Sequence, residues 1–269
     1  MSKFILVLVF ALLLAPLYFM LIGSFQDIHG VMSMPPSLIP HNPIMGNYER
    51  MLAWPLAKWL SNTLFVVFFT VLISVSISAT AGYAFAFYKF PLKKTLWTLF
   101  LVGIMIPRIS LLIPHYIIVR KLGIQGGLWA VILPACFSPV GLYLARTYFE
   151  TVPKSLLESA RLDGCNEIQV LFHVVAPVSK PIVTALSLFA ALASLQDYVW
   201  QSLVLLNPSR QTLIVGMIKA VMSRGGTMEN VNPLGRSFAV GIVLLFPLLV
   251  VFLAANKYFV NSLTGACKE

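Results

Sequence analysis

The sequence predicts an all-α integral membrane protein, because charged residues are scarce and long apolar runs recur along the chain. Hydrophobic residues make up 59% of the 269 residues and charged residues only 10%, whereas a water-soluble domain carries roughly 25% charged residues. Several apolar runs have the length of ~20 residues that a helix needs to cross a bilayer. We therefore expect one transmembrane domain over 1–269, with six transmembrane helices and a polar helical hairpin between the fourth and fifth.

Six apolar stretches are the expected spans. They cover residues 4–22, 61–87, 95–118, 129–148, 182–206 and 238–259. The first resembles the apolar core of a signal peptide, but it is too long and no clean cleavage site follows, so we interpret it as a retained span. Pro107 and Pro114 interrupt the third span and Pro134 and Pro139 the fourth, which predicts bends. Small residues between Ser74 and Gly82 predict close helix packing.

Two long segments join the first span to the second and the fifth to the sixth. Residues 23–60 carry proline-rich turns and a short interfacial helix near 47–52. Trp54 and Trp59 are expected in the aromatic belt at the membrane surface. Residues 207–236 are expected to form a polar loop.

Lysines set the expected orientation in the membrane. Lys89, Lys93 and Lys94 lie in one short loop, which predicts that this loop is cytoplasmic. An even number of spans then places both termini, and the hairpin, in the cytoplasm. The net charge of +10 is carried by loops beside apolar spans, where orientation and contact with lipid headgroups explain it, so no nucleic acid partner is expected.

Cysteine and histidine offer no metal site. The cysteines show no paired spacing, and the histidines are scattered. These residues are Cys136, Cys165, Cys267, His29, His41, His115 and His173. Neither a disulfide framework nor a metal centre is predicted.

A short polar helix signature stands between the fourth and fifth spans. Ser155 and Glu158 fit a capping box at its start, and Gly164 is suited to the left-handed conformation that ends a helix. Asn166 is a candidate cap for a second helix. The pattern predicts two short helices in a hairpin over 151–177.

Two interpretations of this hairpin follow from its chemistry. It is either a connector at the membrane surface with no partner or a docking element for a soluble protein. Leu156, Leu157 and Ala160 are expected on one side of the helix, while Glu158 and Arg161 face elsewhere. An amphipathic helix of this kind fits a groove on a partner.

The spacing of the hairpin residues resembles a family motif. The sequence has Glu158-Ser159-Ala160, Gly164 and then Val174-Val175-Ala176-Pro177, at the spacing of the EAA motif of permease subunits of binding-protein-dependent ABC importers. Ser159, Val174 and Ala176 depart from that motif by small or apolar exchanges. Further stretches resemble the sugar-importer branch of the family, in particular its MalG-like subunits. They are Tyr83-Ala84-Phe85-Ala86, Phe90-Pro91, Arg161-Leu162-Asp163-Gly164 and the ending from Tyr258 to Ala266.

This resemblance implies a permease subunit in a bacterial inner membrane that pairs with a homologous MalF-like permease, an ATPase dimer and an extracytoplasmic solute-binding protein. The helix over 155–164 would be the coupling helix that contacts the ATPase, and the loop over 207–236 would reach the binding protein. The implied coupling residues are Glu158, Ser159, Ala160, Arg161, Asp163 and Gly164. No G-x-x-x-x-G-K-[ST] run occurs, so ATP and Mg would bind to the partner subunits, and this subunit would be non-catalytic and without a cofactor.

Two ionisable residues lie inside expected spans, where a charge is costly and marks a functional candidate. Arg108 and Asp197 either form a structural pair or serve separately, with Arg108 reaching water after a break at Pro107 or lining the path of an acidic, alginate-like oligosaccharide as a bidentate donor. Polar and aromatic neighbours either contact sugar or pack between helices. They are Gln196, Tyr198, Trp200 and Gln201.

Other functional classes fit the sequence less well. An ion-coupled secondary transporter is the alternative, but it predicts an inverted repeat and several intramembrane carboxylates, of which only Asp197 is found. An intramembrane enzyme is disfavoured because the spans lack a Gly-x-Ser-x-Gly elbow, a His-Glu-x-x-His motif and a carboxylate pair. The sugar, acidic or neutral, is left open.

Overall fold

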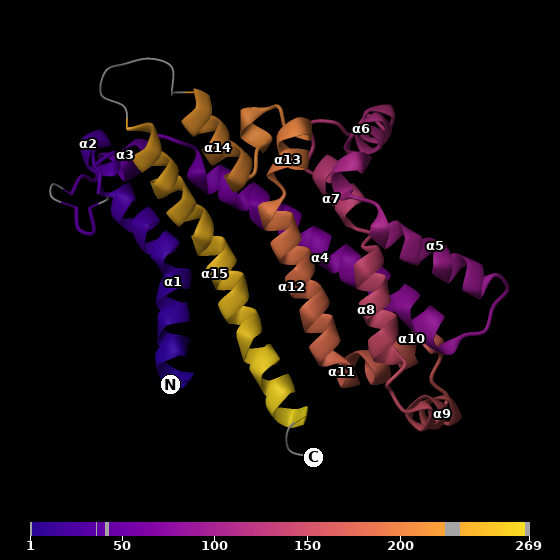
Figure 1. The fold of residues 1–269 in the computed structure, drawn as a ribbon. Coiled ribbons are helices and arrows are strands. Elements are labelled where there is room, and N and C mark those ends of the chain that lie inside the picture. Colours follow the sequence, from indigo (N-terminus) through magenta and orange to yellow (C-terminus); the bar gives the residue numbers. More distant parts are fainter. Residues whose placement is uncertain (1, 36, 41–42, 224–231, 267–269) are drawn as a thin grey trace. The chain divides into compact units, whose positions relative to one another are not determined.

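The computed structural model describes residues 2–35, 37–40, 43–223 and 232–266. These residues form helices and no strands, so the all-α prediction is confirmed (Figure 1). The chain divides into two compact units. The first unit comprises Met1–Asn62 and Gln211–Leu249, and the second comprises Thr63–Arg210 and Val250–Glu269.

The first unit contains the N-terminal helices and most of the last helix. Its helices are α1 (Ser2–Ser24), α2 (Ile28–Val31), α3 (Gly46–Leu52), the start of α4 (Leu56–Phe87), α14 (Leu213–Ser223) and α15 (Pro233–Ala266) up to residue 249. The short helix expected near 47–52 is confirmed as α3. The side chains of the family-like ending from Tyr258 to Ala266 lie outside the described residues.

The second unit carries most of α4 and the helices that follow it. They are α5 (Lys93–Met105), η1 (Arg108–Leu111), α6 (Leu112–Lys121), α7 (Trp129–Ala135), α8 (Pro139–Phe149), α9 (Lys154–Leu162), α10 (Glu167–Gln169), η2 (Val170–Val175), α11 (Ala176–Val178), α12 (Lys180–Gln196), α13 (Tyr198–Val204) and η3 (Pro208–Arg210).

Three helices and three bent helix pairs have the length and composition of membrane spans. The helices α1, α4 and α15 each contain an apolar window long enough to cross a bilayer, at the expected first, second and sixth spans. The bent pairs are α5 with η1–α6 (102°), α7 with α8 (45°), and the arm 167–178 with α12 (88°). We assign α12 to the membrane and the arm to its surface, since the arm turns away nearly at a right angle. The described helices give six spans if each pair counts once.

Tryptophan packing in the first unit differs from the expectation. Trp54 and Trp59 are buried, with ring centroids 6.2 Å apart, so their assignment to a surface aromatic belt is wrong. The cause is a glycine, because a Cβ on Gly216 of α14 would lie 2.3 Å from the Trp59 ring. The Trp59 ring therefore packs into the space that a side chain at position 216 would fill.

The expected polar loop over 207–236 is also corrected in part. It contains the apolar helix α14, and Leu213 and Met217 from that helix join the core of the first unit. Leu213 and Met217 are four residues apart, which is the spacing of one helix face. Residues 224–231 of the expected loop lie outside the described residues.

Close packing of α4 against α8 confirms the prediction made from small residues. A Cβ on Gly82 would lie 2.7 Å from the Cβ of Ala145, and one on Gly141 would lie 2.8 Å from the Ser78 hydroxyl. Both distances are far below van der Waals contact. Glycine on each helix therefore sets how close the two backbones lie.

Breaks interrupt the spans of the second unit. The third span bends after Met105, where Pro107 precedes η1, as predicted. The fifth span was expected to be continuous over 182–206, and this is wrong. It breaks at Asp197, whose carboxylate accepts a hydrogen bond from the backbone N–H of Trp200 (3.3 Å) and thereby caps α13.

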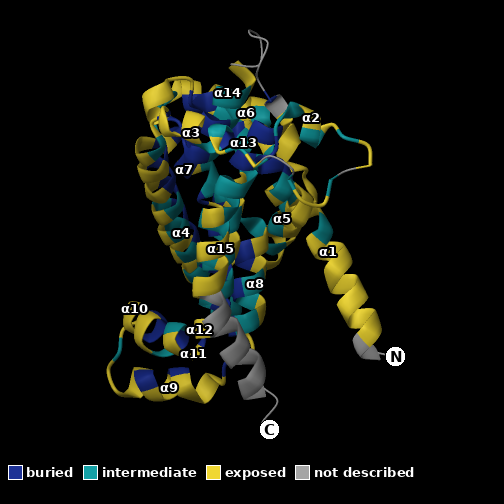
Figure 2. Cartoon of the chain, turned by 90° about the vertical axis from the view of Figure 1, so that its left-hand side faces the viewer, coloured by how far each residue is buried: buried dark blue, intermediate teal, exposed yellow. Residues whose placement is uncertain are grey.

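The hairpin lies at one end of the second unit, and the breaks near α6 and α13 lie toward the other end (Figure 1). Figure 2 shows that α9 has one buried side and is otherwise exposed. Its buried side belongs to a core that also includes Phe149 of α8 and Leu186 of α12. The hairpin is thus packed onto the ends of the spans.

Candidate functional site

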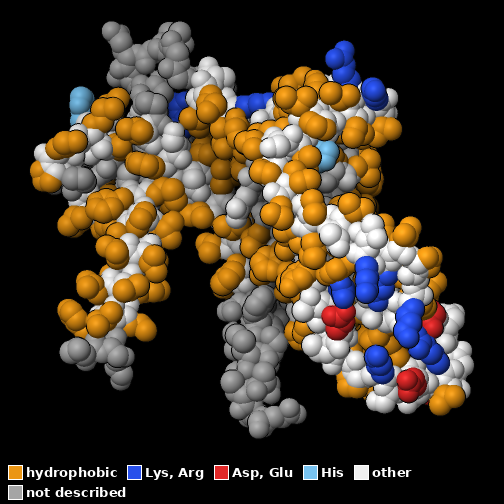
Figure 3. All heavy atoms as spheres, turned by 45° about the vertical axis from the view of Figure 1, so that its right-hand side comes forward, with side chains coloured by type: hydrophobic (Ala, Val, Ile, Leu, Met, Phe, Trp, Pro, Cys, Tyr) orange, Lys and Arg blue, Asp and Glu red, His pale blue; other side chains and the backbone are white. Residues whose placement is uncertain are grey.

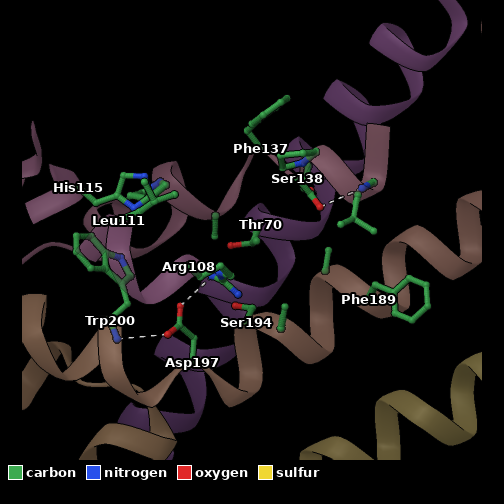
Figure 4. Close-up of a pocket in the computed structure, with 18 of the residues that line it drawn as sticks. Thr70, Arg108, Leu111, His115, Phe137, Ser138, Phe189, Ser194, Asp197 and Trp200 are labelled. Carbon is green, nitrogen blue, oxygen red and sulfur yellow. Dashed lines mark hydrogen bonds and ion pairs between the residues drawn. The ribbon is translucent and has the colours of Figure 1, made fainter. Parts of the chain in front are cut away.

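A cavity of about 1030 Å³ opens inside the second unit (Figure 4). Its walls come from α4 and from the broken pairs α5–α6, α7–α8 and α12–α13. Helix breaks leave backbone groups without helical partners, and such backbone is tolerated at membrane depth only where it lines a cavity or is covered by protein. The helix breaks therefore lie at the wall of the cavity, where backbone of this kind is tolerated.

Arg108 and Asp197 face each other at the cavity. Nη2 of Arg108 lies 3.4 Å from Oδ2 of Asp197, so the structure brings together two residues from different broken spans. The Arg108 side chain is 72% exposed and the Asp197 side chain 17%. The distance between the two atoms is long for a hydrogen bond, and this is the one hydrogen bond that Arg108 makes to the described residues. Other guanidinium donors stay available to water or solute.

Hydroxyl groups line the same cavity. Thr70, Ser74 and Ser78 follow one another at four-residue spacing on α4 and line the wall, as does Ser194 of α12. Thr70 is 2% exposed and Ser194 6%, and the hydroxyl oxygen of each lacks a hydrogen-bond partner among the described residues. Figure 4 shows both residues among those that line the cavity with Arg108. A buried hydroxyl without a partner costs about 1–3 kcal/mol, so these two groups are unsatisfied polar atoms at the cavity wall.

Of the other four residues predicted to lie on the solute path, two line the cavity and two do not. Trp200 and Gln201 line the cavity but are buried, and their side chains donate to the backbone carbonyls of Ala130 (3.1 Å) and Ser194 (2.6 Å). Gln196 is exposed at the end of α12, and neither it nor Tyr198 is among the described residues that line the cavity.

Sequence reasoning missed the hydroxyl row on α4. The signal was present in the spacing, because Thr70, Ser74 and Ser78 recur every four residues in an apolar run. Ser138 of the α7–α8 break also lines the cavity, and its hydroxyl accepts a hydrogen bond from the N–H of Gly141 (3.1 Å). No sequence pattern linked it to α4.

The start of α9 corrects one expectation about the hairpin. The helix begins at Lys154 after Pro153, and no side chain caps it. The capping box expected from Ser155 and Glu158 is therefore wrong, because Ser155 is already inside the first turn. A residue with helical backbone there cannot occupy the cap position.

The end of α9 agrees with the sequence. Gly164 has φ +86°, and its N–H donates to the carbonyl of Arg161 (3.1 Å). The N–H of Cys165 donates to the carbonyl of Ala160 (3.0 Å), which completes a Schellman motif. Asn166 then caps α10 in a capping box with Gln169, so the predicted second start is confirmed.

The two sides of α9 differ from the expectation at one residue. Leu157 and Ala160 are buried in the core beneath the helix, but Leu156 is exposed, so its placement with them is wrong. At the end of the helix, Leu162 is also exposed. The exposed members of the expected coupling set are Glu158, Ser159, Arg161, Asp163 and Gly164. The exposed surface of the hairpin at α9 therefore carries both polar and apolar side chains.

An ion pair crosses the turn of the hairpin. Arg161 of α9 donates through Nε to Oε1 of Glu167 (2.9 Å) and through Nη2 to Oε2 (3.2 Å). Tyr83 of α4 donates its hydroxyl to the same Oε2 (2.7 Å). Hydrogen bonding from Arg161 is the main reason that the pKa of Glu167 falls to about 2. The carboxylate is therefore ionised at neutral pH.

Broken membrane helices around a cavity that holds Arg108 and Asp197, with a packed hairpin at one end, define a membrane permease domain. The comparisons with known proteins agree. The family model described as "Binding-protein-dependent transport system inner membrane component" matches residues 74–265. The chain belongs to this family, and it is an integral inner-membrane component of a binding-protein-dependent transport system.

Two of the curated relatives are permeases of oligosaccharide systems. The arabinooligosaccharides transport system permease protein AraQ of Bacillus subtilis (strain 168) is 31% identical over 207 residues, covering 77% of this chain and 72% of the relative. The galactooligosaccharides transport system permease protein GanQ of the same organism is 30% identical over 236 residues, covering 85% and 81%. The resemblance to the sugar-importer branch is confirmed.

A solved structure shows the same fold. It is a bacterial ABC transporter involved in the import of the acidic polysaccharide alginate, with TM-score 0.83, 20% sequence identity, and coverage of 96% of this chain and 95% of that chain. The alternative of an ion-coupled secondary transporter finds no support in these relatives.

Proposed function

We propose that this chain is a permease subunit of an ATP-driven sugar importer and that α9 couples it to an ATPase. The observation that carries the proposal is the exposed side of α9, a polar helix fixed onto the ends of the membrane spans. The partners are an ATPase dimer, which holds ATP and Mg, a second, MalF-like permease, and an extracytoplasmic solute-binding protein. The chain itself has no catalytic role.

Fixed geometry supports the coupling role. The Schellman turn and the Arg161–Glu167 pair hold the hairpin closed, and Leu157 and Ala160 anchor α9 in the core. A partner that moves α9 therefore also displaces the ends of α4, α8 and α12. Closure of the ATPase dimer would in this way open the cavity on alternating sides of the membrane.

The proposed orientation places the hairpin and both termini in the cytoplasm. Charged side chains support it, because Figure 3 shows basic and acidic groups gathered at the end of the second unit that bears α9 and α10. Lys89, Lys93 and Lys94 lie in and beside the loop between α4 and α5. Clustered lysines favour the cytoplasmic side.

Reversing the charge at Glu158 tests the docking role. In the assembled complex we expect Glu158→Lys to reduce ATP-dependent transport at least about tenfold, the equivalent of ~1.4 kcal/mol, because a cation would replace an anion on the docking surface. Transport into proteoliposomes and co-purification of the ATPase are measured together. Glu49→Lys makes the same charge change on α3 and is the control. Full transport by Glu158→Lys would contradict the proposal.

For the cargo we propose an acidic oligosaccharide of the alginate type. Arg108 is largely exposed at the cavity and its other donors are free to bind a carboxylate. The unpartnered hydroxyls of Thr70 and Ser194 suit the hydroxyl groups of a sugar. The similarity in fold to an importer of an acidic polysaccharide is in line with this cargo.

A neutral oligosaccharide is the second candidate, and the Asp197 carboxylate favours it. Asp197 lies beside Arg108 and offsets its charge, and the relatives AraQ and GanQ are named for arabino- and galactooligosaccharides. Arg108→Ala separates the two cargoes. We expect transport of a uronate oligosaccharide to fall about tenfold or more, the equivalent of ~1.4 kcal/mol, with little change for a neutral one.

The control for this experiment is Arg120→Ala, which removes an exposed cation of α6 that is not among the described cavity-lining residues. If Arg108→Ala transports the acidic oligosaccharide as fast as the parent complex does, and the neutral one as well, the acidic cargo is ruled out and the neutral one is left.

A further inference from the structure

We propose that Tyr83 is a positioning residue that transmits movement of the hairpin to α4. The proposal rests on the proposed coupling function of α9. It assigns to α4 a defined attachment point, which is the hydrogen bond from the Tyr83 hydroxyl to Glu167. Through this bond the hairpin and the wall of the cavity would move together.

Three side chains form the attachment. Glu167 receives Arg161 on both carboxylate oxygens, and its Oε2 also accepts the Tyr83 hydroxyl. One carboxylate thus joins α9, α10 and α4. Hydrogen bonds to an ionised acceptor are shorter and stronger than neutral ones, and a bidentate guanidinium contact adds fixed geometry.

Packing keeps the tyrosine ring in place. Tyr83 is 4% exposed, and its ring centroid lies 5.3 Å from that of Phe87 and 5.8 Å from that of Tyr88. Its neighbour Gly82 fits closely against Ala145 of α8. A force on the Tyr83 hydroxyl is therefore resisted by the backbones of α4 and α8 rather than absorbed by rotation of the ring.

The helix α4 is suited to carry that force over a distance. It runs unbroken from Leu56 to Phe87, while breaks interrupt the third, fourth and fifth spans. Thr70 lies 13 residues before Tyr83, which corresponds to ~20 Å along a helix. Tyr83 and the hydroxyl row of the cavity therefore occupy one stiff element.

Other contacts of the hairpin with the spans differ in kind. The core beneath α9 is formed by apolar side chains such as Leu157, Phe149 and Ile182. Apolar contact is non-directional, so this packing holds the hairpin on the spans without a preferred bond direction. The Tyr83–Glu167 hydrogen bond has a preferred direction, and it fixes the register between α9 and α4.

The test uses the assembled complex with its ATPase and solute-binding protein in proteoliposomes. The measured quantity is the number of sugar molecules transported per ATP hydrolysed. For Tyr83→Phe we expect this ratio to fall several-fold while the complex still assembles. The control is Tyr143→Phe on α8, whose hydroxyl makes no hydrogen bond to the described residues, and we expect its ratio to stay at the parent value.

A second variant separates transmission from a general loss of structure. Glu167→Gln keeps an acceptor for Tyr83 but weakens the Arg161 contact, so it should lower the ratio less than Glu167→Ala. The double variant Tyr83→Phe with Glu167→Ala should transport no worse per ATP than Glu167→Ala alone, because both changes remove one interaction. Should Tyr83→Phe fail to assemble, the comparison of Glu167→Gln with Glu167→Ala decides the question.

The outcomes distinguish this inference from the function on which it rests. A parent complex that shows no ATP-dependent transport overturns the proposed function and the inference with it. A coupled parent complex in which Tyr83→Phe and Tyr143→Phe have equal ratios overturns the inference alone. Additive losses in the double variant overturn it as well.

Discussion

At Gly82 the absence of a side chain is what allows α4 and α8 to approach. A Cβ at this position would lie 2.7 Å from the Cβ of Ala145 and 3.0 Å from the backbone nitrogen of Arg146. Neither neighbour is the end of a flexible side chain. The two backbones would have to separate to admit even a methyl group.

We therefore expect Gly82→Ala to destabilise the protein by about 1–3 kcal/mol. Alanine gains up to about 1 kcal/mol over glycine from helix propensity, but the overlap with Ala145 outweighs that gain. The thermal unfolding midpoint of the purified complex is the measurement, and it should fall by several degrees. Gly46→Ala on α3 is the matched control, since a Cβ there meets nothing within 4 Å. Equal midpoints would show that α4 and α8 are not held at this distance.

The residues of the cavity were predicted unevenly from the sequence. Arg108 and Asp197 stood out because charge is costly at membrane depth, but their pairing was left open. They are 89 positions apart, and two helix breaks bring them together. Thr70 and Ser194 were missed because hydroxyls are common in packed spans, and in the structure their lack of partners distinguishes them.

At the scale of the element, the hairpin ends show which local signals are reliable. Gly164 and Asn166 act through their own backbone and nearest neighbours, so both assignments are confirmed. The capping box at Ser155 fails because Pro153 sets the start of α9 at Lys154. A cap assignment is only as accurate as the helix boundary behind it.

Asn166→Ala should loosen the second arm of the hairpin. Loss of the capping box costs about 1 kcal/mol, which corresponds to roughly a fivefold increase in local opening. Hydrogen exchange of the amides in α10 is the measurement. Ser155→Ala removes the serine that was expected to cap α9 but does not, so it should leave the exchange of the α9 amides unchanged. Faster exchange in α9 after Ser155→Ala would restore the original capping assignment.

A helix break was predicted where its cause is local to the chain, and it was missed where its cause lies in the next helix. The bend at Pro107 was predicted because proline itself disrupts a helix. The break at Asp197 was not, since the residue ends one helix by capping the next. Helix α14 was missed because the polar residues on either side of it favoured a loop. The average composition of residues 207–236 is polar, and this average hides a short apolar helix.

At the scale of the molecule, the proposed topology predicts where each loop is found. With six spans and a cytoplasmic lysine loop, both termini face the cytoplasm. Reporter fusions that fluoresce only in the cytoplasm should be bright at the C-terminus and after Lys94, and dark within residues 37–40. A bright fusion at the last of these positions would reverse or reject the six-span topology.

The fold class was predictable from the whole sequence because it depends on hydropathy and length, which are properties of many residues at once. The family followed from a few fixed spacings around Glu158, Gly164 and Pro177, and the family comparison confirms it. The cavity could not be predicted, because it arises where α4 meets the broken third, fourth and fifth spans. No single stretch of sequence contains it.

The low pKa of Glu167 has a consequence for proton balance. A carboxyl whose pKa falls from its ordinary 4.5 to about 2 binds fewer protons in the folded state. The stability it contributes is fully present above pH ~4.5 and is lost only as the pH falls toward about 2. Between pH 5 and 9 this pair therefore takes up and releases no protons. The hairpin bond is thus insensitive to pH changes across this range, including a pH difference between the two sides of a membrane.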